Sequence, residues 1–426
     1  MLTDSPLSAA LLFQAIGAQT DTVCLNIGEG DLQACIASMM GVKCLILGFD
    51  YNRHHGSIGV AEASQIQTVL KLSRERGLPM ALLIESSGIR VTDGTAGIAS
   101  LRRVLRELMD ARLEGARLLA MVTRCAFGGA SLLACACDRL YMHSDSLLSM
   151  SGPKLIQQQV GIEHFNAGDP LAVKALMAGA ARATVSQRMP LVNASVSAYV
   201  AALKNWLNES PSPAPQLQWL TTQWTCLCAR LAQPLQLPQP LELPSHLLPA
   251  HTSELLLQVC PGTDELLFCE NVWMTNGDAT TRPRVLGLMA PQGCSARDAL
   301  ALVHALLQPL PNGQKRTVLL IDSPGHAATP EDEQVIFSEV LALLSLALRW
   351  LHRQGHCVDV VVSASGGGGI QAALAAGASS VAMGPQARLY VLPKAAMQAL
   401  NKAEDEEAGT LATALATGAV DKAFEG

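Results

Sequence analysis

Four glycine turns are the residues of this 426-residue chain that point most directly to chemistry. The turns lie at Gly88 and Gly128–Gly129 in the first half, and at Gly325 and 366–369 in the second. Each follows a run of apolar, β-forming residues, and a helical stretch of nearly the same length separates the two turns of each half. The same strand–turn–helix layout therefore occurs twice.

Glycine turns at helix N-termini present backbone N–H groups that no side chain covers. Such groups stabilise the negative charge that develops on a carbonyl oxygen in acyl chemistry. The predicted first oxyanion hole is formed by Gly88 and Gly129 with Gly128 beside them, and the second by Gly325 and Gly368 with Gly367 beside them. A single glycine after a strand is typical of any tight β–α turn, but four in duplicated register favour an oxyanion function.

Polar residues lie beside the first-half turns. Arg90 and Ser87 are candidate substrate-binding residues, because a guanidinium group matches the geometry of a carboxylate. The alternative for Arg90 is a surface arginine paired with Asp93 or Glu85.

Ser323 and His326 flank the second-half turn and are candidate proton donors. A histidine transfers protons near neutral pH. The alternative for His326 is a residue that caps a helix or faces solvent.

Three arginines on one predicted helix, Arg102, Arg103 and Arg106, form a candidate cationic patch. Such a patch suits an acidic acyl carrier protein or the phosphates of coenzyme A. An ordinary solvated helix face is the alternative.

Other classes of function lack their signatures. The sequence contains no GxSxG, HExxH or GxxxxGK[ST] motif. The run 367–372 fits the loose pattern G-x-G-x-x-A, but no acidic residue follows before Glu404, so a dinucleotide site is disfavoured. The 12 cysteines form no CxxC pair, and the net charge of −6 disfavours nucleic acid. We therefore expect no metal, no cofactor and no nucleic-acid partner.

The order of predicted elements indicates an α/β fold in two domains. Strands alternate with helices through both halves, which is typical of parallel sheet covered by helices. The expected domains are residues 1–208 and 251–426, joined by a proline-rich linker, 209–250, without regular structure. No basic residue precedes Lys43 and no apolar run is long enough to span a bilayer, so we expect a cytoplasmic protein. The high apolar content is also compatible with a homo-oligomer.

These motifs resemble the carboxyltransferase branch of the crotonase superfamily. The first half is similar to the β subunit of biotin-independent malonate decarboxylase, and the second half to its γ subunit. The matching segments are 56–59, 85–90 (where the family tends to read E-S-G-G-A-R), 127–131 and 137–138, then 322–327, 355–356 and 366–369. The chain departs from the pattern at Ser87, where glycine is usual, and in its four consecutive glycines.

The resemblance implies a fused chain of two crotonase-like domains, built of ββα repeats, that form an intramolecular pseudo-dimer. It also implies decarboxylation of a malonyl thioester on an acyl carrier protein, giving the acetyl thioester and CO₂. The phosphopantetheine arm of the carrier, or coenzyme A, would be part of the substrate. The alternatives are a component that transfers the carboxyl group to biotin, and an inactive scaffold that binds a carrier protein.

Overall fold

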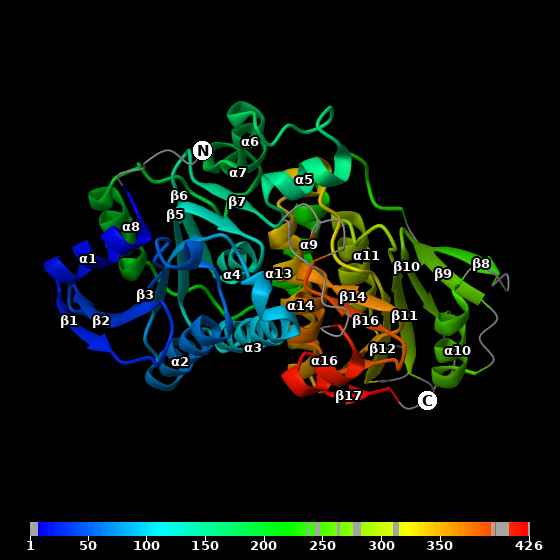
Figure 1. The fold of residues 1–426 in the computed structure, drawn as a ribbon. Helices are drawn as coiled ribbons and strands as arrows, with labels where there is room; N and C mark the ends of the chain where they lie inside the picture. Colours follow the sequence, from blue (N-terminus) through cyan, green and yellow to red (C-terminus); the bar gives the residue numbers. More distant parts are fainter. Residues whose placement is uncertain are drawn as a thin grey trace. The chain divides into compact units, whose positions relative to one another are not determined.

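The computed structural model describes residues 7–236, 238–242, 248–261, 265–275, 283–309, 315–392, 397 and 409–424. They belong to two units, each discontinuous in sequence (Figure 1). Unit 1 consists of Met1–Asp93, Arg103–Pro215 and Ala328–Ala342. Unit 2 consists of Gly94–Arg102, Gln216–Ala327 and Leu343–Gly426.

Unit 1 is built on a sheet in the order β1-β2-β3-β4-β5-β6, with β7 paired to β5. The strands are β1 (Asp21–Leu25), β2 (Gln33–Met39), β3 (Val42–Gly48), β4 (Met80–Ser86), β5 (Leu118–Phe127), β6 (Arg139–Met142) and β7 (Leu147–Ser149). Strands β3 to β6 are parallel, and β1 and β2 extend the sheet in antiparallel pairing. Strand β4 is buried along its whole length, as its continuous apolar run predicts.

Helices and short 3-10 turns complete unit 1. They are α1 (Ala9–Gln19), η1 (His54–Gly56), α2 (Val60–Arg76), η2 (Val91–Asp93), most of α3 (Gly94–Leu113), α4 (Gly129–Ala136), α5 (Pro153–Val160), α6 (Pro170–Met177), α7 (Gly179–Val185), α8 (Val196–Asn208), α12 (Pro330–Gln334) and the start of α13 (Phe337–Arg353). Both α1 and α4 pack against β4.

Unit 2 repeats this plan. Its main sheet has the order β17-β15-β13-β12-β11-β10-β9-β8, and β14 pairs with β16. The strands are β8 (Gln239–Glu242), β9 (Glu265–Cys269), β10 (Val272–Thr275), β11 (Arg284–Met289), β12 (Arg316–Asp322), β13 (Cys357–Val362), β14 (Ser365–Gly367), β15 (Ser380–Met383), β16 (Arg388–Tyr390) and β17 (Lys422–Ala423). The helices are α9 (Leu217–Cys228), α10 (Ala250–Val259), α11 (Ala296–Leu307), the rest of α13, α14 (Gly368–Gly377) and α16 (Leu411–Thr417).

The central strands of the two sheets share one order. Parallel strands β3, β4, β5 and β6 correspond to β11, β12, β13 and β15. Antiparallel strands precede each set, β1 and β2 in unit 1 and β8, β9 and β10 in unit 2. The predicted α/β fold with a duplicated, mostly parallel architecture is confirmed. The pseudo-dimeric association of the two domains stays a prediction.

The segment expected to be an irregular linker contains regular structure. Helix α9 and strand β8 lie within 209–250, so that expectation is wrong for these elements. The prolines cluster on either side of α9, which leaves its 12 residues free of helix breakers. Leu220 and Leu227 are buried, and the Trp224 indole donates a hydrogen bond to Leu300 O at 2.9 Å, so the helix is held by unit 2.

Each unit also contains a short segment from the other half of the sequence. The first nine residues of α3 belong to unit 2, whereas α12 and the start of α13 belong to unit 1. The predicted domains were contiguous ranges and did not include this exchange. Among the described residues, no helix is both long and apolar enough to cross a bilayer.

Candidate oxyanion site at the glycine turns

In unit 1 the two glycine turns lie against each other. Strands β4 and β5 are parallel neighbours, so the turns that follow them meet at the carboxyl edge of the sheet, where ligands of α/β proteins usually bind. A Cβ atom on Gly88 would lie 2.9 Å from Phe127 O, and one on Gly128 would lie 3.8 Å from the Gly88 Cα. Gly88 (φ +109°) and Gly128 (φ +53°) both have backbone conformations that favour glycine.

The N-terminus of α4 presents an open donor. Gly129 is the first residue of the helix, and its N-cap residue, Gly128, has no side chain to accept a hydrogen bond. No residue in the described part of the chain accepts a hydrogen bond from the Gly129 N–H. The helix dipole places partial positive charge at the same point, so the site favours an anionic oxygen.

The other predicted donor of this site is already engaged. The Gly88 N–H donates to the Ser86 hydroxyl at 3.1 Å, while Gly88 O accepts from the Ile58 N–H at 2.8 Å. The two peptide groups that flank the Gly88 Cα are therefore both held by hydrogen bonds. An oxygen placed at this N–H would share it with the Ser86 hydroxyl.

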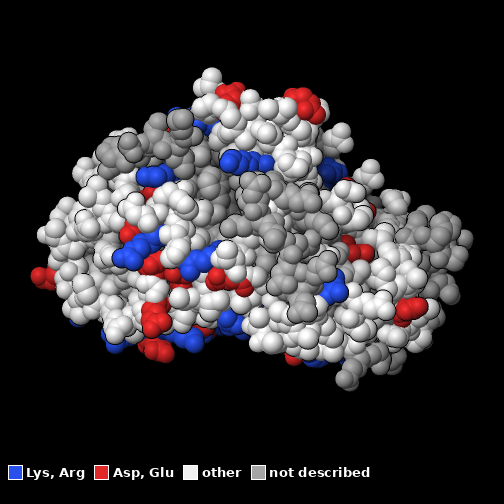
Figure 2. Space-filling model, viewed as in Figure 1, with Lys and Arg blue, Asp and Glu red and all other residues white. Residues whose placement is uncertain are grey.

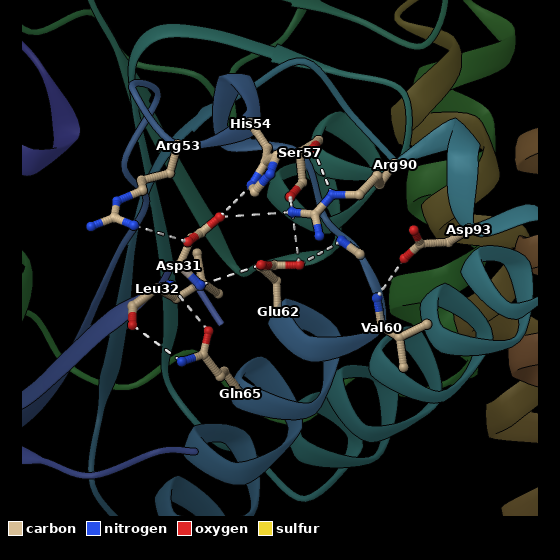
Figure 3. A network of polar contacts seen from close by, with 11 residues as sticks. Asp31, Leu32, Arg53, His54, Ser57, Val60, Glu62, Gln65, Arg90 and Asp93 are labelled. Atoms are coloured by element: carbon tan, nitrogen blue, oxygen red, sulfur yellow. Dashed lines mark hydrogen bonds and ion pairs between the residues drawn. The ribbon is translucent and has the colours of Figure 1, made fainter. Parts of the chain in front are cut away.

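Arg90 belongs to a polar network beside the turn (Figure 3). Its Nη2 lies 3.1 Å from Glu62 Oε2 and 3.9 Å from Asp31 Oδ2. Its Nε donates to the Ser57 hydroxyl at 3.2 Å. Arg90, predicted to bind substrate, thus connects the Gly88 turn to the start of α2. Its acidic partners are Glu62 and Asp31 instead of Asp93 or Glu85.

Gly59 allows this network to form. A Cβ at Gly59 would lie 2.6 Å from Arg90 Nη1 and 2.8 Å from Asp93 Oδ2. The Gly59 N–H donates to Glu62 Oε2 at 2.9 Å, and Asp93 accepts from the Val60 N–H at 2.9 Å. Ser87, the other predicted substrate residue, is exposed, and its N–H donates to His55 O at 3.0 Å.

In unit 2 the turn after β12 has the same hydrogen bonds as the Gly88 turn. The Cys294 N–H donates to Gly325 O at 2.9 Å, and the Ala327 N–H donates to Cys294 O at 2.8 Å. In unit 1 the equivalent bonds are Ile58 N–H to Gly88 O (2.8 Å) and Arg90 N–H to Ile58 O (2.9 Å). Gly325 therefore corresponds to Gly88, as predicted, and His326 takes the place of Ile89.

The second glycine pairing differs from the prediction by one residue. Gly368 has φ +57°, close to the +53° of Gly128, and a Cβ on Gly368 would lie 3.5 Å from the Gly325 Cα. Gly368 thus corresponds to Gly128, and Gly369 corresponds to the donor Gly129. Gly367 has an extended backbone and packs closely against Pro324: a Cβ added at Gly367 would lie 2.3 Å from Pro324 O.

His326 caps the helix at this second site. Its Nδ1 accepts a hydrogen bond from the Gly369 N–H at 3.3 Å, and only 6% of the residue is exposed. Burial lowers the pKa of His326 to about 4, so the imidazole is neutral at pH 7. The structure agrees with the helix-cap alternative: the donor that is open in unit 1 is occupied in unit 2 by a side chain of the protein.

His326 should titrate near pH 4 and should make unit 2 less stable in acid. The folded protein holds the neutral form, while the unfolded chain takes up a proton below about pH 6.5. The free energy of unfolding therefore decreases as pH falls from about 6.5 to 4, because protonation favours the unfolded chain. The total decrease is roughly 3 kcal/mol. NMR titration of the imidazoles, with His326→Gln for assignment, measures the pKa. An imidazole of His326 that titrates between pH 6 and 7 would contradict the capped geometry.

Ser323 is a structural part of its turn. Its hydroxyl donates to Gly325 O at 2.7 Å, and its N–H donates to Ser365 O at 2.9 Å. The side chain is fully buried. The hydroxyl proton that made Ser323 a candidate donor is therefore engaged within the turn.

The predicted arginine patch does not exist as three exposed side chains. Arg102 is only 4% exposed and belongs to unit 2, where its guanidinium donates to Ala375 O, Gly418 O, Ala419 O and Asp421. The prediction that Arg102 docks a carrier is wrong because its charge is enclosed. Arg103 is exposed and Arg106 half-buried, and they stay candidates. On the face drawn in Figure 2, acidic and basic side chains of unit 1 are intermixed.

A buried polar cluster lies behind the N-terminus of α4, and the sequence alone does not predict it. It contains Ser131, Ser149, Ser151, Arg182, Glu333 and Ser338. Glu333 and Ser338 come from Ala328–Ala342, the segment of the second half that belongs to unit 1. No local motif indicates this, because the contacts join residues more than 150 positions apart.

Comparison with known proteins identifies the family. The family model described as the carboxyl transferase domain matches residues 15–228, which is half of the chain and includes every strand of the unit 1 sheet. The chain belongs to the carboxyl transferase domain family. The match contains the Gly88 turn and the N-terminus of α4.

Curated relatives of this carboxyl transferase domain protein match over shorter stretches. The acetyl-coenzyme A carboxylase carboxyl transferase subunits beta/alpha of Salinispora arenicola are 24% identical over 140 residues, covering 32% of this chain and 25% of theirs. The malonyl-S-ACP:biotin-protein carboxyltransferase MADC of Malonomonas rubra is 26% identical over 130 residues, covering 27% of this chain and 41% of its own. The chain thus spans between a quarter and two-fifths of the length of these relatives.

Among solved structures, a Pseudomonas malonate decarboxylase hetero-tetramer in complex with malonate aligns with this chain at a TM-score of 0.47 and 17% identity. The alignment covers 55% of this chain and 93% of that chain.

Proposed function

We propose that this carboxyl transferase domain protein decarboxylates a malonyl thioester, carried by an acyl carrier protein, to the acetyl thioester. The observation that supports the proposal most is the open Gly129 N–H at the N-terminus of α4, directly beside the Gly88 turn. Membership of the family adds to it, because carboxyl transfer and decarboxylation share an enolate intermediate. In this proposal no metal, nucleotide or biotin takes part, and the phosphopantetheine arm is part of the substrate.

The thioester oxygen would lie at the Gly129 and Gly88 N–H groups. The bond between the carboxylate carbon and the α-carbon breaks, CO₂ leaves, and the electron pair forms an enolate whose oxygen carries the negative charge. Fixed N–H donors stabilise that charge more in the transition state than in the substrate, which is the condition for faster reaction. A proton then binds to the α-carbon and gives the acetyl thioester.

The thioester is assigned to unit 1 because the equivalent donor of unit 2, the Gly369 N–H, is bound to His326. The neutral His326 imidazole and the engaged Ser323 hydroxyl are poor acids at pH 7. Solvent water is therefore our proposed source of the proton. Arg103 and Arg106 stay the candidates for docking the acidic carrier.

The second candidate function is transfer of the carboxyl group to a biotinylated protein. It is favoured by the match to a relative named as a malonyl-S-ACP:biotin-protein carboxyltransferase. Both reactions need the same enolate and therefore the same donors. They differ only in the fate of the carboxyl group.

Mass spectrometry of malonyl-carrier incubated with the protein separates the possibilities. Decarboxylation removes one CO₂ from the carrier without any other protein, whereas carboxyl transfer requires a biotinylated acceptor that gains the same mass. A carrier that keeps its malonyl group under both conditions would leave only the inactive, carrier-binding scaffold.

A further inference from the structure

The peptide group between Gly128 and Gly129 is held at Gly128 O by the Leu132 N–H, which donates at 3.1 Å, and by one buried side chain, Ser131. The Ser131 hydroxyl donates to Gly128 O at 2.7 Å. Because a peptide group is planar and trans, its C=O and N–H point in opposite directions. A hydrogen bond that fixes Gly128 O therefore also fixes the direction of the Gly129 N–H, the open donor.

Ser338 supports Ser131 from behind. The two hydroxyl oxygens are 2.6 Å apart, and both side chains are buried. A serine hydroxyl has a single proton, and that of Ser131 is given to Gly128 O. Ser338 must then donate to Ser131, which orients the Ser131 proton toward the peptide group.

A second chain of contacts holds the other side of Gly128. The Gly128 N–H donates to Ser149 O at 3.1 Å. Two residues further on, the Ser151 N–H donates to Glu333 Oε1 at 2.8 Å. Glu333 Oε2 lies 3.1 Å from the Nη2 of Arg182, a fully buried arginine that also donates to Leu148 O. The turn after β7 is thus fixed at both its start and its end.

Both chains of contacts end on the segment Ala328–Ala342. Glu333 lies in its short helix α12, and Ser338 lies in the first turn of α13. Part of the sequence's second half therefore completes the donor site built by the first.

We propose that Ser338 is a positioning residue for the oxyanion donor: through Ser131 it fixes the peptide group that carries the Gly129 N–H. Glu333 has the same role on the Gly128 N–H side. The proposal rests on the function proposed above. Neither residue touches substrate.

Ser338→Ala is the variant that tests this role, because removing Glu333 would leave the buried Arg182 charge without its partner and threaten folding. The expected result is a turnover number lowered about tenfold with KM nearly unchanged, since misorientation of a donor affects the transition state more than binding. Ser131→Ala should lower it at least as much. Because Ser338 acts through Ser131, the double variant should be no slower than Ser131→Ala alone.

Ser345→Ala is the matched control. Ser345 lies on the same helix, is equally buried, and donates its hydroxyl proton to Ala373 O at 2.9 Å, in unit 2. Its loss should lower the melting temperature about as much as the loss of Ser338 does, and should leave the turnover number unchanged. Equal loss of turnover in both variants, or additive losses in the double variant, would overturn the positioning role.

The ¹⁵N–¹H resonance of Gly129 gives a readout that does not depend on activity. It should shift in Ser338→Ala and Ser131→Ala and stay in place in Ser345→Ala. If the wild-type protein leaves malonyl-carrier intact, the proposed function fails while this resonance still tests the positioning. If the wild-type protein is active and the resonance does not move in Ser338→Ala, the positioning proposal fails by itself.

Discussion

Replacing Gly129 by proline should lower the rate of CO₂ release from malonyl-carrier by about 100- to 1000-fold, the usual effect of removing one oxyanion donor. Proline has no N–H, and it is well tolerated as the first residue of a helix, the position of Gly129 in α4. The preceding Gly128 has ψ −126°, far from the helical values that a following proline disfavours. The fold should therefore persist while the donor is lost.

Gly369→Pro is the control for this prediction. It removes the corresponding N–H of unit 2, which is bound to His326 and not open to substrate. Its effect on CO₂ release should be much smaller. Thermal melts of both variants distinguish misfolding from a loss of catalysis. A folded Gly129→Pro protein that releases CO₂ at the parent rate would show that Gly128 and Gly129 form only a tight turn.

Replacing Arg102 by alanine should lower the free energy of unfolding of unit 2 by about 3 kcal/mol. Three backbone carbonyls and the Asp421 carboxylate would lose their donor inside the protein. Asp421 itself is 42% exposed, so solvent screens the ion pair and most of the loss comes from the carbonyls. Denaturant unfolding with a probe in unit 2 measures the change.

Two further variants test whether the lost hydrogen bonds of Arg102 cause the loss of stability. Arg102→Lys keeps the charge but not the planar fork of donors, so it should recover only a small part of the stability. Arg103→Ala, an exposed neighbour on the same helix, should change the stability by less than about 0.5 kcal/mol. An Arg102→Ala protein as stable as the parent, with weakened carrier binding, would restore the surface role that the sequence suggested.

The strands and turns around the site were predictable because local sequence decides them. An apolar run that ends in glycine, such as the one before Gly88, predicts a buried strand and the turn that follows it. The register of the second turn was not predictable, since four consecutive glycines offer no side chain to distinguish one position from the next. Only the positive φ of Gly368 shows which glycine begins the turn of α14.

The misassigned residues have partners that are remote in sequence. Arg102 looks like its neighbours Arg103 and Arg106 on a helix, and its burial depends on Ala375 and Asp421, far along the chain. Arg90 was recognised as a candidate because it follows a glycine turn. Its role in holding that turn depends on Glu62, which a single sequence does not place beside it.

The segment Ala328–Ala342 also sets an order of events during synthesis. Residues up to 215 can begin to fold as soon as they leave the ribosome, but Glu333 and Ser338 are still to be made. At typical elongation rates of about 5 to 20 residues per second, this delay is on the order of ten seconds. During that time Gly128 and its neighbours lack their buried partners. The site in the nascent first half therefore reaches its final geometry only after Ala328–Ala342 has been synthesised.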